Sequence, residues 1–221
     1  QSGNVVDTKL SRFEVYDDLF PSRKEGVNAW VSIMRGCDKF CTFCIVPFTR
    51  GRERSRGVES VKNEVINAVS KGFVEVTLLG QNVNSFKHNN HNFHYLLEEI
   101  ASIPGLKRIR YTSPHPQDIT CELLKIMAGH PVICNSVHLP LQAGSNRILK
   151  RMNRTYSKEH FIGLAHEIRE LLPGGGISTD IIVGFPGESE EDFQETLGVM
   201  ERVQFDSAFI FKYSPRPYTK A

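Results

Sequence analysis

The chain has 221 residues, of which 40% are hydrophobic, and its formal net charge is +2. This length and apolar content suit one domain with a substantial core, and the mild charge excludes a protein that binds nucleic acid through bulk charge alone. The sequence lacks an apolar run of membrane-spanning length and the charged and apolar regions of a signal peptide. We therefore expect a cytoplasmic protein without membrane contact.

Short strand-like runs alternate with helical patterns after residue 26, which is typical of a parallel sheet built from βα units. The expected strands, in chain order, are Val27 to Met34, Phe73 to Leu79, Leu106 to Thr112, Val132 to Leu139, Ile177 to Val183 and Asp206 to Tyr213. The expected helices cover residues 58–71, 93–100, 119–128, 161–171 and 193–200, where apolar residues recur at helical spacing. Six such units are too few for a closed eight-stranded barrel. The pattern predicts an α/β fold, a partial (β/α)6 barrel with a mainly parallel sheet and outer helices.

Polar and Gly/Pro-rich segments follow each expected strand, and the loops at the carboxyl ends of parallel strands meet at one rim, where ligands bind. The first of these loops contains Cys37, Cys41 and Cys44, and the others are "LGQNVNSF", "TSPHP", "HLPLQAGS", "GFPGE" and "YSPRP". We expect these six segments to face one cavity. Residues 1–26 are interpreted as a lead-in segment, and residues 27–217 as the core domain.

The three clustered cysteines have C-x3-C-x2-C spacing, and the chain has five cysteines in all, an odd number. This arrangement favours a metal site in a reducing compartment over a disulfide framework. Thiolates select zinc or iron–sulfur clusters, and a structural zinc site needs a fourth ligand. Cys121 and Cys134 lie in apolar contexts and are interpreted as core residues. Three ligands suit a cubane cluster with one open iron, while a zinc-stabilised, non-catalytic RNA-binding module remains the alternative.

The segments "IMRGCDKFCTFCIVPFTRGRERSR", "LLGQNVNSF", "TSPHP", "HLPLQAGS", "ILKRMNRTYS", "DIIVGFPGE" and "YSPRP" extend over nearly the whole chain. Together they resemble the methylthiotransferase group of the radical S-adenosylmethionine superfamily, on its tRNA branch (MiaB-type). The branch of the same group that modifies a ribosomal protein is the alternative. The resemblance implies that Cys37, Cys41 and Cys44 hold a 4Fe-4S cluster whose open iron binds S-adenosylmethionine, giving a 5′-deoxyadenosyl radical.

The resemblance further implies 2-methylthiolation of N6-(dimethylallyl)adenosine beside the anticodon of a tRNA. It implies a second 4Fe-4S cluster on an N-terminal domain that this chain does not hold, and a C-terminal RNA-binding domain whose linker would start at residues 218–221. The expected partners are the tRNA anticodon stem-loop and an electron donor such as a flavodoxin or ferredoxin, and the expected state is a monomer. We expect the core alone not to complete methylthiolation.

Further site residues are expected at the rim, with no side chain acting alone as the catalytic group. The resemblance implies S-adenosylmethionine contacts from Gln81, Asn82, Gln142, Arg154 and Asp180, and also from Ser145. Arg50, Arg52, Arg54 and Arg56 alternate with other residues, so in an extended loop they would point the same way and could bind tRNA phosphates. Ser113, His115 and His138 lie at strand ends. An apolar pocket for the dimethylallyl group is expected near Ile45, Val46 and Phe48.

Overall fold

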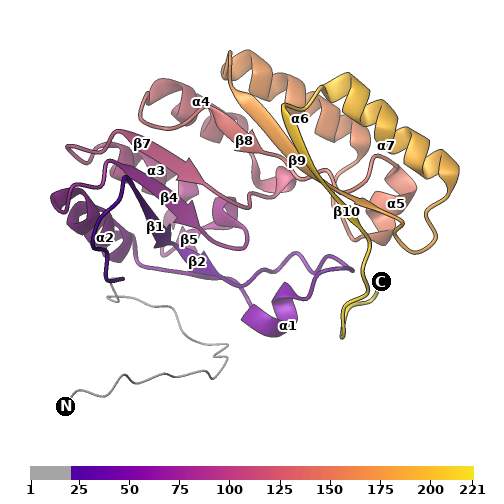
Figure 1. Ribbon diagram of the computed structural model, residues 1–221, viewed down its shortest axis with the longest axis horizontal. Helices are drawn as coiled ribbons and strands as arrows, with labels where there is room; N and C mark the ends of the chain where they lie inside the picture. The colour runs from indigo at the N-terminus through magenta and orange to yellow at the C-terminus, as the bar shows by residue number, and fades with distance from the viewer. Residues whose placement is uncertain (1–20) are drawn as a thin grey trace.

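A computed structural model describes residues 21–221 of the chain, so most of the expected lead-in segment lies outside the described residues. Within these residues the main strands form two three-stranded parallel sheets, with the spatial orders β1-β4-β7 and β10-β9-β8. Their bounds are Asn28–Ser32 (β1), Glu75–Leu79 (β4), Arg108–Tyr111 (β7), Ser136–His138 (β8), Gly176–Val183 (β9) and Ser207–Lys212 (β10). A parallel bridge between Ile109 and Ile133 connects the two sheets. The strands therefore follow one another in chain order around an open, curved sheet (Figure 1).

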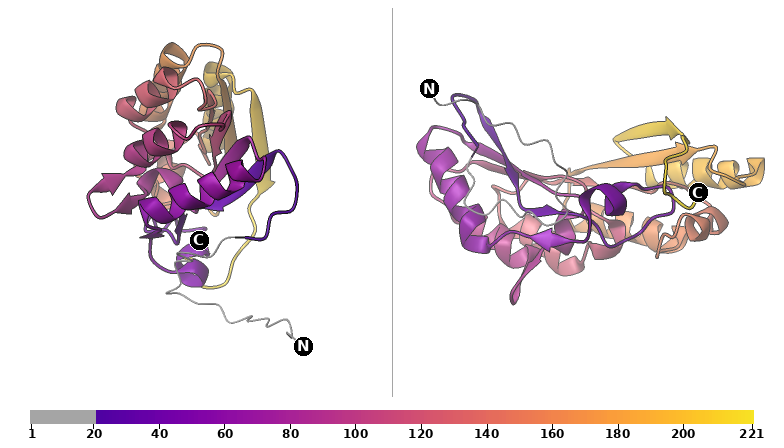
Figure 2. Two further views of the ribbon diagram at one scale, coloured as in Figure 1. Left: turned by 90° about the vertical axis from the view of Figure 1, so that its left-hand side faces the viewer. Right: turned by 90° about the horizontal axis from the view of Figure 1, so that it is seen from below.

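Helices follow the strands and lie along the outer side of the curved sheet (Figure 2). The longer ones are Val58–Ser70 (α2), Phe93–Ala101 (α3), Cys121–Gly129 (α4), Lys158–Leu171 (α6) and Glu190–Val203 (α7). The shorter ones are Val46–Arg50 (α1), Asn146–Arg151 (α5) and the 3-10 turns Val83–Ser85 (η1) and Pro116–Asp118 (η2). The small strands Met34–Arg35 (β2) and Arg54–Ser55 (β3) pair with each other, as do Lys87–His88 (β5) and His91–Asn92 (β6). In residues 21–221, no helix is both long and apolar enough to cross a membrane.

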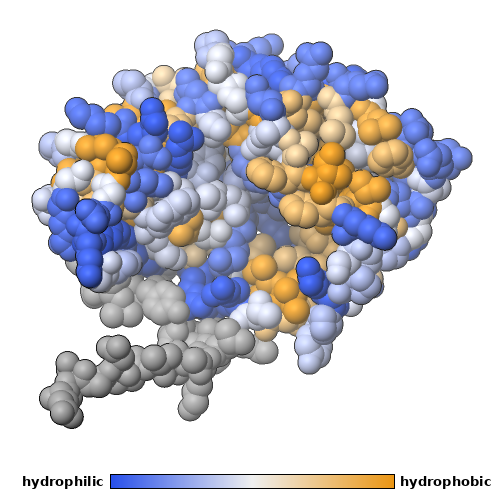
Figure 3. Space-filling view, viewed as in Figure 1, coloured by the Kyte–Doolittle hydropathy of each residue, from blue (hydrophilic) through white to orange (hydrophobic). Residues whose placement is uncertain are grey.

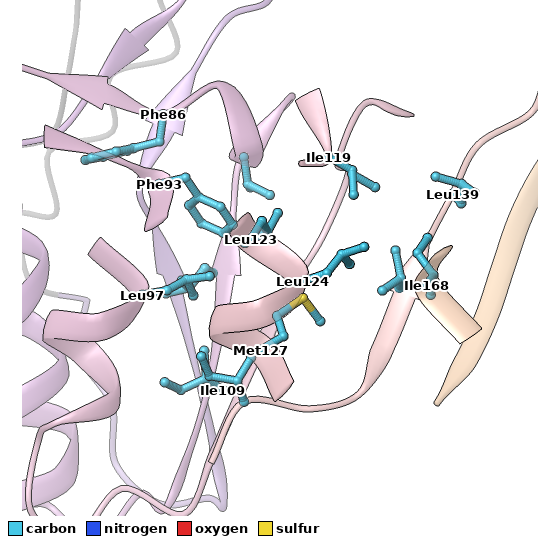
Figure 4. Close-up of a cluster of buried hydrophobic side chains, with 14 of the residues drawn as sticks. Phe86, Phe93, Leu97, Ile109, Ile119, Leu123, Leu124, Met127, Leu139 and Ile168 are labelled. Atoms are coloured by element: carbon cyan, nitrogen blue, oxygen red, sulfur yellow. The ribbon is translucent and has the colours of Figure 1, made fainter. Parts of the chain in front are cut away.

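The core lies between the sheet and the outer helices. Its apolar side chains come from both layers, as Phe93, Leu97, Leu123 and Leu124 of α3 and α4 packing towards Ile109 of β7 illustrate (Figure 4). These side chains are at most 1% exposed, and each such burial contributes about 1.5–3 kcal/mol. Because side chains alternate along a strand, the opposite face of the sheet is left for other residues. A cavity lies on that face, and its lining residues are Asn28, Trp30, Thr77, Arg110, Tyr111, Thr112, Cys134, Ser136, His138 and Ser178.

The predicted partial barrel is confirmed, and each expected strand and long helix is present with shifted ends. The expected strand from Val132 to Leu139 keeps regular pairing only at Ser136–His138, with a single bridge at Ile133. The short helix α1 was not predicted, although Pro47 in its first turn favours a helix start. The edge strand β10 is exposed along its whole length, and apolar side chains gather over it (Figure 3).

Helix α7 begins with a capping box formed by Ser189 and Asp192. The Asp192 carboxylate also accepts hydrogen bonds from Ser145 Oγ, at 2.6 Å, and from the Arg147 guanidinium. This places the side chain of Ser145 against α7, so the structure does not support its expected contact with the cofactor. The Arg147 guanidinium, with help from Ser145 and Ser189, holds the pKa of Asp192 well below its usual value.

We expect Asp192→Asn to lower the free energy of unfolding at pH 7 by about 1.5–3 kcal/mol, since hydrogen bonds to a charged acceptor are lost. A carboxylate with a depressed folded-state pKa stabilises the fold above its unfolded pKa, and this contribution is lost as the pH falls. The difference between wild type and variant should therefore shrink below about pH 4. Urea unfolding from pH 7 to pH 3 measures it, with Glu201→Gln, an exposed change on the same helix, as control. A pH-independent difference would contradict the charge-based explanation.

Candidate cofactor site

The three clustered cysteines lie on an irregular loop between β2 and α1. Gly36 N donates to Gln81 Oε1 at 2.7 Å, and Cys37 N donates to Gly51 O at 3.2 Å, so the start of the loop is fixed against two neighbouring segments. The turn after α5 supports the middle of the loop, because Asn153 Nδ2 donates to the carbonyl oxygens of Lys39 (3.1 Å) and Phe40 (3.0 Å). These contacts hold the thiols at the rim of the sheet.

One rim cavity contains all three thiols together with the predicted cofactor contacts. Its lining includes Cys37, Cys41, Cys44, Gln81, Asn82, Gln142, Arg154 and Asp180, and also Lys39, Phe43, Ser113, Pro114, His115, His138 and Pro140. An adjoining cavity shares Phe43, Gln142 and Asp180 with it and reaches Ser214 and Arg216 of the "YSPRP" segment. Figure 3 shows a hollow between the two halves of this face. Four of the six expected segments therefore line this cavity and the "YSPRP" segment lines the adjoining one, whereas "GFPGE" lines neither of them.

The donor set of the cavity suits an iron–sulfur cluster. Burial raises the pKa of Cys37 to about 11 and also raises the pKa of Cys44, so both are thiols at neutral pH and would release protons on binding metal. In the part of the chain that the structure describes, no three His, Cys, Asp or Glu side chains converge enough to hold a single metal ion. A cubane cluster differs in this respect, because each thiolate binds a different iron.

Asn82 offers an unused acceptor at the cavity. Its side chain is almost fully buried, and its Nδ2 donates to Asp118 Oδ2 at 2.9 Å. Its Oδ1 has no hydrogen-bond partner among residues 21–221. A buried acceptor without a partner costs about 1–3 kcal/mol, which a bound ammonium group would recover. Gln81 differs, because its Oε1 already accepts from Gly36 N, so Gln81 closes the cysteine loop.

Gln142 and Asp180 come from neighbouring segments of the rim. Gln142 has a positive φ of 69°, a conformation that is costly for a non-glycine residue and that occurs preferentially at functional sites. Its backbone N donates to Asp180 O at 2.8 Å, and its carbonyl accepts from Ile182 N at 2.9 Å. The Asp180 carboxylate lies 3.1 Å from His138 Nε2, whose other ring nitrogen lies 2.9 Å from Ser178 Oγ. The backbone of Gln142 is thus fixed to β9, the strand that carries Asp180.

His115 and Ser113 follow β7 and also line this cavity. Burial, together with the Arg154 and Lys39 charges, lowers the pKa of His115 to about 2, so this imidazole is neutral at physiological pH. Its Nδ1 accepts from Gln117 N at 3.3 Å, and its backbone N donates to Asn84 Oδ1 at 2.9 Å. His115 therefore acts as a neutral wall of the site.

The four arginines behind the cysteines do not share one environment, because Arg50 ends α1, and exposure falls from Arg50 and Arg52 to Arg56. Arg50 and Arg52 are exposed, and Arg52 Nε donates to Asp38 Oδ1 at 2.6 Å. Arg54 is half-buried and donates to the Arg50 carbonyl at 3.1 Å. Arg56 is 3% exposed, and its Nη1 lies 2.5 Å from Glu64 Oε2. The expectation that Arg56 faces a ligand is wrong, since a buried ion pair holds it inside the fold.

The sequence analysis did not predict three residues that support this site, Asp118, Lys39 and Tyr156. Asp118 links Asn82 to Lys39, whose Nζ donates to Asp118 Oδ1 at 2.9 Å. Tyr156 Oη accepts a hydrogen bond from Arg154 Nε. Its position two residues after Arg154, in "RTYS", was the sequence feature from which this contact could have been predicted. The expectation of a core position for Cys121 is wrong, because this residue begins α4 and is exposed.

An open parallel barrel with three thiols and a polar cavity at its rim defines the core of a cluster-dependent enzyme. The family model of the Radical SAM superfamily matches residues 31–200, and the chain belongs to this superfamily. It is 51% identical over 210 residues to the tRNA-2-methylthio-N(6)-dimethylallyladenosine synthase of Moorella thermoacetica, covering 94% of this chain and 47% of the relative. With the synthase of that name from Bacteroides fragilis (strain ATCC 25285) it shares 49% identity over 225 residues, covering 98% of this chain and 49% of the relative. The predicted resemblance is thus confirmed, and the chain spans about half the length of these curated relatives.

Solved structures agree with the fold. The radical S-adenosylmethionine methyltransferase TsrM from Kitasatospora setae, with cobalamin and a [4Fe-4S] cluster bound, matches with a TM-score of 0.71 at 19% identity, covering 86% of this chain and 38% of that chain. Methylornithine synthase (PylB) matches with a TM-score of 0.61 at 16% identity, covering 87% of this chain and 55% of that chain. At such identities the likeness concerns the fold alone.

Proposed function

We propose that this chain is the catalytic core of a tRNA methylthiotransferase that acts on C2 of N6-(dimethylallyl)adenosine next to the anticodon. The observation that carries the proposal is that three thiols line one rim cavity together with Asn82, Gln142 and Asp180. The high identity to synthases named for this product supports the choice of substrate. The second 4Fe-4S cluster belongs to a part of the enzyme outside this chain.

Cys37, Cys41 and Cys44 would hold the 4Fe-4S cluster, and one iron would stay open for S-adenosylmethionine. When bound, the two supply a radical able to remove a hydrogen atom from an unactivated C–H bond. Asn82 Oδ1 would accept from the methionyl ammonium group, since it is buried and lacks a partner in residues 21–221. Gln142 and Asp180 would contact the remainder of the cofactor, where the two adjoining cavities meet. The buried walls, including neutral His115, would exclude water from the reacting atoms.

The exposed arginines next to the cysteine loop would bind the RNA backbone. Arg50 and Arg52 carry this role in the proposal, with the half-buried Arg54 beside them, because guanidinium groups match phosphate geometry. The dimethylallyl pocket near Ile45, Val46 and Phe48 stays a prediction. The electron donor of the flavodoxin or ferredoxin class, the monomeric state and the cytoplasmic location are also predictions.

We expect Arg50→Ala to weaken binding of a tRNA anticodon stem-loop and to reduce the slope of log affinity against log salt by about one unit. The change removes one phosphate contact, and with it one set of released counterions. Fluorescence anisotropy at several salt concentrations measures the slope. The control is Arg202→Ala, an exposed arginine on α7, which should leave the slope unchanged. Equal slopes for wild type and Arg50→Ala would show that Arg50 does not contact an RNA phosphate.

Anaerobic reconstitution with iron and sulfide tests the proposed cofactor chemistry. The reconstituted chain should be brown, contain a 4Fe-4S cluster and release 5′-deoxyadenosine from S-adenosylmethionine under reduction. A colourless protein with a single zinc ion bound by four protein ligands would overturn the proposal and favour the structural RNA-binding module. The product 2-methylthio-N6-(dimethylallyl)adenosine should form only when the rest of the enzyme is present.

A further inference from the structure

Arg154 is a buried cation directed at a predicted cluster ligand. It is 9% exposed, and its Nη1 lies 3.4 Å from Cys41 Sγ. The other two nitrogens are fixed by the protein, since Nε donates to Tyr156 Oη at 2.8 Å and Nη2 donates to Pro140 O at 3.0 Å. The guanidinium also lies over the Tyr156 ring, 5.0 Å from its centroid. The direction of the Nη1 group is thus set by contacts that do not require a cofactor.

The chain segment that carries Arg154 is attached to the cysteine loop. Thr42 N donates to Met152 O at 3.1 Å, and Thr42 Oγ1 donates to Arg151 O at 2.9 Å. The Asn153 amide bridges two carbonyl groups of the same loop. These four hydrogen bonds hold the two segments in register.

The charge of Arg154 is not neutralised by its hydrogen-bond acceptors. These acceptors are a carbonyl oxygen, a phenol and a thiol. Burial raises the pKa of Tyr156 to about 12, so the phenol is neutral at physiological pH. Arginine stays protonated in proteins, and in a buried site its charge acts through a lower effective dielectric than in water. The positive charge is therefore directed at the sulfur of Cys41.

We propose that Arg154 is a positioning residue that raises the reduction potential of the cluster by donating a charged hydrogen bond to the Cys41 thiolate. This inference rests on the proposed function, because it requires a 4Fe-4S cluster on the three cysteines. Uptake of one electron from a low-potential one-electron donor makes the cluster more negative by one charge, with no bond broken and no proton moved. A fixed cation at a ligand sulfur stabilises that reduced state, and hydrogen bonds to sulfur are known determinants of cluster potential.

The proposal differs from the contact with S-adenosylmethionine expected from the sequence. If Arg154 bound only the methionyl carboxylate, its removal would weaken cofactor binding and leave the potential of the cofactor-free cluster unchanged. If Arg154 acts on Cys41, the potential changes before any S-adenosylmethionine is added. A redox titration without S-adenosylmethionine therefore separates the two roles.

The experiment compares reconstituted wild type with Arg154→Met, Arg154→Lys and Tyr156→Phe, titrated with dithionite and followed by electron paramagnetic resonance. At a fixed solution potential, Arg154→Met should show about a tenfold lower ratio of reduced to oxidised cluster, which corresponds to a shift of about 59 mV to more negative potential for one electron. Arg154→Lys should recover most of the shift, because it keeps the charge. Tyr156→Phe removes the acceptor of Arg154 Nε but keeps the Pro140 and Cys41 contacts, so its potential should shift in the same direction as that of Arg154→Met, by a smaller amount.

A second measurement does not depend on Arg154→Met, in which the charge is removed. It therefore stays informative if that variant does not fold or does not bind a cluster. Wild type labelled with 15N-arginine should show a weak 15N coupling to the reduced cluster in pulsed spectra, and labelled Arg154→Lys should lose it. Equal potentials for wild type and Arg154→Met, or absence of the coupling in wild type, would overturn the inference while leaving the cluster in place. Failure of wild type to assemble any cluster would instead overturn the proposed function, and the inference with it.

Discussion

Replacement of Cys41 by alanine is expected to abolish the 4Fe-4S cluster and the reductive cleavage of S-adenosylmethionine. The remaining thiols, Cys37 and Cys44, would leave two of the four irons without a protein ligand, and only one of these two is the iron that would bind S-adenosylmethionine. Loss of an outer-shell partner already costs metal sites roughly 10–100-fold in affinity or activity, and loss of a direct ligand should cost more. We therefore expect 5′-deoxyadenosine formation to fall more than about 100-fold, with iron and sulfide content near zero.

The matched control is Cys121→Ala. Cys121 is exposed at the start of α4 and does not line the rim cavity, so its removal should leave iron content, colour and 5′-deoxyadenosine formation unchanged. Iron and sulfide analysis per chain and product chromatography measure both variants in parallel. Retention of four irons in Cys41→Ala, or loss of the cluster in Cys121→Ala, would contradict the assignment of ligands.

The convergence of the site residues at one rim could be predicted, because it depends on order along the chain. Alternating strand and helix patterns imply a parallel sheet, and such a sheet brings the carboxyl ends of its strands to one edge. This geometric rule is enough to bring Cys37, Asn82, Gln142 and Asp180 together, although they are far apart in sequence. The resemblance to a known family then indicated which of the rim residues to expect as contacts of the cofactor.

The errors concern side chains whose partners are set by packing between elements. Arg56 was expected at a ligand surface, but its guanidinium forms a buried ion pair with Glu64 of α2. Ser145 was expected at the cofactor, but its hydroxyl group donates a hydrogen bond to Asp192 of α7. Cys121 was expected in the core, but the phase of α4 turns it outwards. Residue type and spacing do not specify these partners, because they depend on the rotation and docking of each helix.

The second large effect is expected for Gly36→Ala, at the start of the cysteine loop. Gly36 has a φ of 78°, and a Cβ atom there would lie 2.0 Å from Arg52 O and 2.6 Å from Gly51 O. The clash is with backbone, which cannot move aside without breaking the hydrogen bond from Cys37 N to Gly51 O. We expect a loss of about 3–5 kcal/mol in the free energy of unfolding, since backbone strain and steric overlap add. Cluster content should fall with it, because the loop that presents the thiols cannot close.

The control Gly174→Ala separates the two causes. Gly174 has nearly the same φ, 74°, and no heavy atom within 4 Å of an added Cβ, so this variant carries the backbone strain without the clash. It should cost only about 1–2 kcal/mol and should keep its cluster. Urea unfolding together with iron analysis measures both variants. Equal losses of stability, or a full cluster in Gly36→Ala, would mean that the close approach of residues 51–52 to Gly36 is not required for the cysteine loop. Steric overlap occurs only at Gly36. The difference in cluster content between the two variants therefore measures how much closure of the cysteine loop contributes to cofactor binding.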